Sequence, residues 1–164
     1  MSLVDTLARA TQPWADYYAQ SDVLQVIAGF GHAGAILFAG LTALSADRAV
    51  LRAVRTPRLR GTALEQVQHA HARVFAGLGF ALLTGLTMLS AQIAILLPSF
   101  WFWLKMAGLA TLVWNGRRIL RAERLIVDQT DHHQRWAALA APARASVALW
   151  LSIALVGVLL TTVA

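Results

Sequence analysis

The stretch "VLQVIAGFGHAGAILFAGLTALSA", residues 23–46, decides the fold of this chain. An α-helix of this length, rising ~1.5 Å per residue, crosses a hydrocarbon layer of about 30 Å. His32 is the only ionisable residue in the stretch. Such a group is costly inside a membrane, so it usually has a partner or a function. The stretch therefore predicts a transmembrane helix and makes His32 the first candidate functional residue.

The composition places the whole chain in the membrane class. Of its 164 residues, 58% are hydrophobic and only 13% are charged, whereas soluble domains have about 25% charged residues. The absence of cysteine excludes disulfides and thiolate metal sites. The formal net charge of +6 indicates basic cytoplasmic loops rather than a nucleic-acid partner. The expected partner is the lipid bilayer.

Four apolar stretches are long enough to be spans, at about 23–46, 74–97, 100–120 and 147–163. They predict an all-α, integral membrane four-helix transmembrane bundle, with residues 1–164 as a single domain. Before the first span lie Trp14, Tyr17 and Tyr18. Aromatic rings of this kind are enriched at the membrane surface, so residues 1–20 are predicted to include an interfacial helix.

The arginines predict the orientation of the spans. One group follows the first span and another follows the third: Arg48, Arg52, Arg55, Arg58 and Arg60, then Arg117, Arg118, Arg121 and Arg124. Basic residues concentrate on the cytoplasmic side. We therefore expect a multi-pass protein of the bacterial inner (plasma) membrane, with both termini outside.

Four polar residues are expected at one depth in the outer half of the membrane. His32 and Lys105 each lie about 10 Å below the outer surface, counted at ~1.5 Å per residue. Thr84 and Thr87 fall in the outer half of the second span. Because consecutive helices usually neighbour each other, these residues are predicted to line one site.

Helical periodicity adds small-residue faces to this site. At about 100° per residue, His32 shares a face with alanines, and Lys105 shares one with Gly108. On the second span the corresponding stripe is Arg73, Gly77, Thr84, Thr87 and Ala91. Small residues admit a close helix or a flat cofactor. The alternative is that His32 only hydrogen-bonds a backbone carbonyl or a threonine, and that the Lys105 side chain extends outward to the interface.

The other four histidines lie toward the inner side. His69 and His71, in "QHAHAR", are two residues apart, which is about 200° on a helix, so at most one of them faces a given site. His132 and His133 lie in "DHHQR" and are expected to be solvated loop residues. The alternative is a metal or haem ligand set on the cytoplasmic side that includes His69 or His71.

Three motifs carry a resemblance to a known family group. They are "GHAGAILFAGL" at residues 31–41, "TG" at Thr84–Gly85 and "FWLKMAGLATLVWN" at residues 102–115. The pattern resembles the copper-resistance CopD-like families of small four-helix bacterial membrane proteins. It is more distantly similar to the HemJ-type protoporphyrinogen oxidase. The resemblance covers roughly residues 22–121. It implies haem b binding or haem biosynthesis on one side and copper handling on the other, with His32 and Lys105 as the family's first-span histidine and third-span lysine.

The function expected from these observations is binding of haem b or a related porphyrin within the helix bundle, for electron transfer or porphyrin redox chemistry. Imidazole is a common axial ligand of haem iron, and Lys105 or Arg73 could neutralise a propionate. A single haem at His32 would be five-coordinate, use Lys105, or take a ligand from a second subunit of a homo-oligomer. The alternative is a non-catalytic accessory or copper-handling protein in which His32 is structural. An electron donor or acceptor is a further expected partner.

Overall fold

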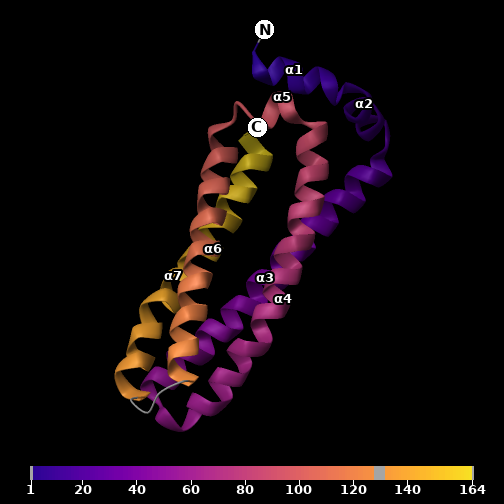
Figure 1. Ribbon diagram of the computed structural model, residues 1–164. Coiled ribbons are helices and arrows are strands. Elements are labelled where there is room, and N and C mark those ends of the chain that lie inside the picture. Colours follow the sequence, from indigo (N-terminus) through magenta and orange to yellow (C-terminus); the bar gives the residue numbers. More distant parts are fainter. Residues whose placement is uncertain (1, 128–131, 164) are drawn as a thin grey trace.

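The computed structural model describes residues 2–127 and 132–163, apart from the side chains of residues 125–135, 161 and 163. The described chain is all-helical, which confirms the all-α part of the predicted fold class (Figure 1). The elements are α1 (Leu3–Ala10), α2 (Gln12–Gln20), α3 (Asp22–Arg55), the 3₁₀ turn η1 (Pro57–Leu59), α4 (Arg60–Ala91), α5 (Ile93–Leu96), α6 (Phe100–Val127) and α7 (His132–Val163).

The first long helix, α3, has clear local signals at both ends. Ser21 caps its start, with the hydroxyl oxygen accepting from the Leu24 N–H at 3.3 Å. Arg52 and Arg55 occupy its last turn, where positive charge interacts favourably with the helix dipole. The helix therefore continues past the apolar stretch at residues 23–46, and basic residues expected in a loop are helical.

Three segments are long and apolar enough to cross a membrane within the described residues: Asp22–Arg55, Pro57–Ala91 and Trp136–Leu160. They are consistent with contact with a lipid bilayer. The third predicted span lies in α6, which is not among them. Its hydropathy is lowered by Lys105, Asn115 and the arginines that begin at Arg117. The second predicted span also differs in its end, because α4 stops at Ala91 and α5 follows.

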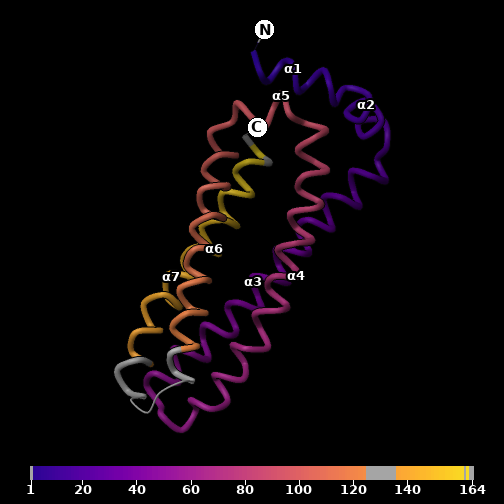
Figure 2. Tube along the Cα trace, in the orientation of Figure 1, coloured from indigo at the N-terminus to yellow at the C-terminus, as the bar shows by residue number. Residues whose placement is uncertain are grey.

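The four long helices lie side by side (Figures 1 and 2). α3 packs along both α4 and α7, and α7 packs along α6. The backbones of α4 and α6 do not pack closely against each other, so the group of helices has an open side between them. This open side is the feature of the fold that positions the candidate sites.

Two short helices lie across one end of the long ones, where a single interfacial helix was expected. α1 contacts α5, and α2 contacts α3 and α4. Trp14 of α2 donates from its indole N–H to the backbone oxygen of Thr87 at 3.3 Å. The helical path is interrupted at Thr11, and Pro13 lies in the first turn of α2, a position where proline is tolerated because its missing N–H has no partner there in any case.

Small residues bring α3 and α4 close together, as the alanine face of α3 predicts. Ala35 and Ala39 are buried. A Cβ atom built on Gly77 would lie 2.9 Å from the Ala39 Cβ and 3.2 Å from the Ala35 backbone oxygen. Contacts this short leave no room for any side chain larger than glycine at position 77.

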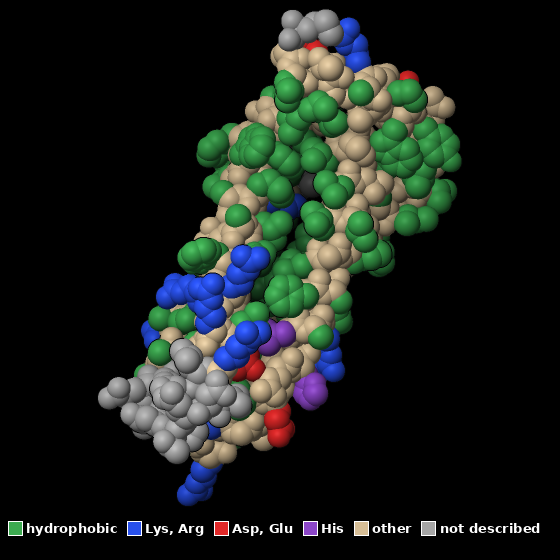
Figure 3. Space-filling view, in the orientation of Figure 1, with side chains coloured by type: hydrophobic (Ala, Val, Ile, Leu, Met, Phe, Trp, Pro, Cys, Tyr) green, Lys and Arg blue, Asp and Glu red, His purple; other side chains and the backbone are tan. Residues whose placement is uncertain are grey.

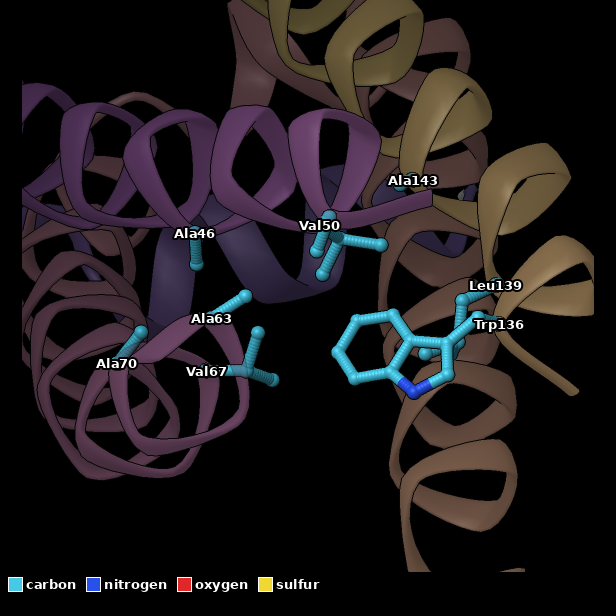
Figure 4. Packing of buried hydrophobic residues seen from close by; sticks show 9 residues of the cluster. Ala46, Val50, Ala63, Val67, Ala70, Trp136, Leu139 and Ala143 are labelled. Carbon is cyan, nitrogen blue, oxygen red and sulfur yellow. The ribbon is translucent and has the colours of Figure 1, made fainter. Parts of the chain in front are cut away.

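The end of the molecule opposite α1 and α2 contains the larger of two apolar clusters. In Figure 4 the indole of Trp136, from α7, is directed toward Val50 of α3 and Val67 of α4. Leu139 and Ala143 extend the cluster along α7. This end also carries the exposed arginines of α3 and α6. Figure 3 shows most of the basic side chains there, a further basic group at the end with the N-terminus, and many hydrophobic side chains on the face between. We call the end that contains Trp136 the arginine-rich end, and the other the α1–α2 end.

Candidate functional site

His32 lies in the α1–α2 half and faces α4. Its Nδ1 is 2.8 Å from the Ala81 backbone oxygen and 3.2 Å from the Thr84 hydroxyl oxygen. A carbonyl oxygen can only accept, so Nδ1 carries the proton and donates it. In the neutral ring, Nε2 then has a free lone pair. The hydrogen bond therefore fixes both the tautomer and the orientation of the imidazole.

Gly85 makes room for this imidazole. A Cβ atom at position 85 would lie 3.0 Å from His32 Cε1 and 3.3 Å from Nδ1. The Thr84 hydroxyl donates to its own helix backbone, to the oxygens of Phe80 and Ala81. Its oxygen is consequently available to accept from His32. The Thr84–Gly85 pair quoted above thus forms the wall against which His32 packs, and we call these residues and His32 the His32 site.

Lys105 is half-buried near the His32 site. Its charge acts on the imidazole of His32, and its Nζ lies 3.9 Å from where a Cβ of Gly157 on α7 would be. The ammonium is therefore directed toward a neighbouring helix. None of the four predicted spans contains Asp or Glu, so no carboxylate at this depth neutralises it. Lys105 is thus half-buried and has no counter-ion from the predicted spans.

The other residues predicted for this site are placed differently. Thr87 donates its hydroxyl to the Leu83 backbone oxygen and contributes only its carbonyl to the contact with Trp14. Arg73 is exposed on α4, well toward the arginine-rich end. The structure thus brings His32 together with Thr84, and Lys105 within electrostatic range, but does not bring Thr87 or Arg73 to them.

The two histidines of "QHAHAR" have opposite environments, as their spacing predicts. His69 is exposed, whereas His71 is half-buried and faces the open side between α4 and α6. There its Nε2 lies 2.7 Å from Glu123 Oε2 of α6. This contact joins two helices whose backbones do not pack together. With Nε2 engaged, the remaining ring nitrogen of His71 is the only one that could take a metal.

A cavity lies between the four long helices in the arginine-rich half, rather than beside His32. Its volume is about 80 Å³, and its walls are mostly aliphatic and aromatic. Three polar side chains reach it, one each from α3, α4 and α7: Asp47, His71 and Ser146. Asp47 is only 6% exposed and lies beside Ser146. We call this space the Asp47 cavity.

A metal centre made of several side chains is not found in the part of the chain that the structure describes. No group of three or more His, Asp or Glu residues there could hold a metal ion. The backbones of His132 and His133 begin α7, and their side chains lie outside the described residues. Haem differs from a bare copper ion here, because its macrocycle leaves only axial positions for the protein.

Sequence reasoning missed Asp47, Glu123, Asn115 and Ser146. Asn115 is buried and donates from Nδ2 to the Pro142 backbone oxygen at 2.8 Å. One signal could have found Asp47: it follows Ala39, Ala43 and Ala46 on the small-residue face of α3, so helical periodicity turns it inward. Glu123 carried no such signal because arginines surround it in the sequence.

Comparison of the chain with protein-family models, with curated proteins and with solved structures finds no match.

Proposed function

We propose that this chain is a four-helix transmembrane protein of the bacterial inner membrane that binds haem b, or a related porphyrin, at His32. Haem supplies one-electron redox chemistry when it is bound. The observation that carries the proposal is the hydrogen bond from His32 Nδ1 to the Ala81 oxygen. It leaves Nε2 as the free donor atom of the ring.

The arrangement of His32 fits an axial ligand. Metal-ligating histidines generally donate their second ring N–H to a backbone carbonyl or a carboxylate, which fixes the tautomer and the ring orientation. Ala81 and Thr84 provide those acceptors from α4. Within the described chain, no hydrogen bond engages Nε2.

Lys105 favours a ligand that carries an anionic group. A cation without a counter-ion is costly inside a membrane, and a porphyrin propionate would neutralise it. The open side between α4 and α6 gives a flat molecule a lateral route into the bundle. Figure 3 shows a hollow in the apolar surface between the α4 side and the α6 side. His32 would hold the iron, and Lys105 would hold a carboxylate.

The test is the visible absorption spectrum of the full chain, purified from membranes and also incubated with haemin. We expect a Soret band that shifts on reduction with dithionite. His32→Ala should lose the band or shift it strongly. His69→Ala, which changes an exposed histidine of α4, is the matched control and should leave the spectrum unchanged. A folded wild-type protein that stays colourless after incubation with haemin would refute the proposal.

The same hydrogen bonds favour a second candidate, in which His32 is a structural residue of a non-catalytic accessory protein. The imidazole already joins α3 to Ala81 and Thr84 of α4. In that case His32→Ala lowers stability by about 1 kcal/mol, the net value of a typical hydrogen bond. His32→Asn, whose side-chain amide can donate to the Ala81 oxygen, restores part of it. Haem ligation predicts instead that His32→Asn loses the spectrum.

A further inference from the structure

We propose that the Asp47 cavity is a proton-binding site, in which the Asp47 carboxylate takes up one proton from the arginine-rich side of the molecule. The new O–H bond forms on a carboxylate oxygen, and the proton comes from a hydronium ion, which leaves as water. This site is separate from His32 and does not depend on whether haem binds there.

The side chain of Asp47 is buried in largely apolar surroundings. The residue is 6% exposed, and its Oδ2 atom is buried without a hydrogen-bond partner. Ser146 is the polar neighbour of the carboxyl group. An isolated carboxylate in apolar surroundings carries a large desolvation cost, and such groups are neutralised by a proton rather than left charged. A protonated carboxyl also gains an O–H that can donate.

Among the described residues, no Lys or Arg side chain lines the cavity. From α4, the titratable group that faces the cavity is His71, which is paired with Glu123 of α6 at 2.7 Å. From α7, Ser146 reaches the cavity, and it cannot carry charge. The neighbouring Arg48 on α3 is exposed and turns away. His71 and Glu123 satisfy each other, which leaves the Asp47 charge unmatched.

The cavity also needs a route by which water and protons reach Asp47. His71 lines the cavity and also exposes 24% of its side chain, so it lies between the cavity and the surroundings on the open side of the bundle. The cavity volume of about 80 Å³ has room for several water molecules, each of which needs roughly 10–15 Å³. Water beside His71 would connect Asp47 with the exterior.

A bound metal ion accounts for these features less well. A hard cation such as Ca²⁺ takes six to eight oxygen ligands, and Mg²⁺ takes six. The described residues include no group of three or more acidic or histidine side chains that could hold a metal, and the cavity walls are largely apolar. A proton needs one oxygen atom, which Asp47 provides.

The experiment is infrared spectroscopy of the full chain in detergent or nanodiscs as a function of pH. Exposed carboxyls become protonated only well below pH 7, so a carboxyl whose protonated band appears at higher pH than theirs is a protected group. We expect such a band, and we expect it to shift when the protein is made with ¹³C-labelled aspartate but not with labelled glutamate. This labelling needs no variant and distinguishes Asp47 from Glu123.

Asp47→Asn should remove the band, whereas Glu65→Gln, an exposed carboxylate change on α4, should leave it in place. Ser146→Ala should keep the band but move its frequency, because the polar neighbour of the carboxyl is lost. The proposal is overturned if no carboxyl becomes protonated at higher pH than the exposed ones, if the band follows labelled glutamate, or if it persists unchanged in Asp47→Asn.

Discussion

Position along one helix decides the roles of His69 and His71. They are two residues apart on α4, so their side chains point in opposite directions. His69 is exposed, and His71 contacts Glu123. The Glu123 side chain is 8% exposed, and His71 is its partner across the gap between the two helices.

Replacement of His71 by alanine should therefore destabilise the protein. The change leaves a buried carboxylate unpaired, which costs about 1–3 kcal/mol. The measurement is denaturant unfolding in detergent, followed by circular dichroism. His69→Ala is the control and should change the free energy of unfolding very little. Equal effects of the two substitutions would show that the His71–Glu123 contact does not stabilise the fold.

At the scale of helix pairs, α3 and α4 depend on small residues at their contact. Gly77 allows the approach because Ala39 Cβ and the Ala35 oxygen occupy the space that its side chain would need. Gly79, two residues later on the same helix, has no atom within 4 Å of an added Cβ. The two glycines provide a matched test of helix packing.

Gly77→Ala should separate the two helices and destabilise the protein by about 1–3 kcal/mol, the usual cost of overpacking. Neither a Cβ atom nor a backbone oxygen can rotate away, so the helices themselves must move. Gly79→Ala should be neutral or slightly stabilising, because alanine favours helix more than glycine does. Thermal unfolding of both variants in the same detergent measures the difference. A Gly77→Ala protein as stable as Gly79→Ala would contradict the close contact.

Between α6 and α7 there is a buried polar contact, unlike the small-residue contact between α3 and α4. Asn115 donates to the Pro142 oxygen at 2.8 Å. Interhelical hydrogen bonds of this kind contribute about 0.6 kcal/mol on average and up to ~1.7 kcal/mol in membrane proteins. Asn115→Ala should lower stability by an amount in this range. Thr111→Ala, which removes a hydroxyl bonded only to its own helix, should have a smaller effect in the same unfolding assay. The reverse order would rule out a stabilising role for the Asn115 contact.

At the scale of the whole molecule, charge is separated along the long axis. The exposed arginines of α3 and α6 lie at one end, and α1, α2 and the last turns of α7 lie at the other (Figures 1 and 3). This polarity supports an orientation with the arginine-rich end in the cytoplasm.

Reporter fusions test that orientation. A reporter after Ala164 should be active on the outer side of the inner membrane, and one inserted at Thr56, between α3 and η1, should be active in the cytoplasm. The two positions serve as controls for each other. A cytoplasmic signal at Ala164 would contradict the four-span arrangement, including a span in α6.

Sequence periodicity was enough to predict the four long helices, though not their ends, together with the buried alanine face of α3 and the inward orientation of one histidine of the His69–His71 pair. These features follow from local spacing, because a helix fixes the relative directions of its side chains. The pairing of His32 with Ala81 and Thr84 was anticipated only as one alternative. Its acceptor is a backbone oxygen, which every residue carries and no sequence pattern marks.

The sequence by itself determined that the chain is helical, apolar and polarised by its arginines, because composition and periodicity are properties of each segment alone. Only the tertiary structure decided that α4 and α6 stay apart, that His71 meets Glu123 across the gap, and that Asp47 is buried beside Ser146. These outcomes depend on which helices become neighbours and at what register. Contacts between residues far apart in the chain, such as His71 and Glu123, result from packing of all four long helices together, and no single segment encodes them.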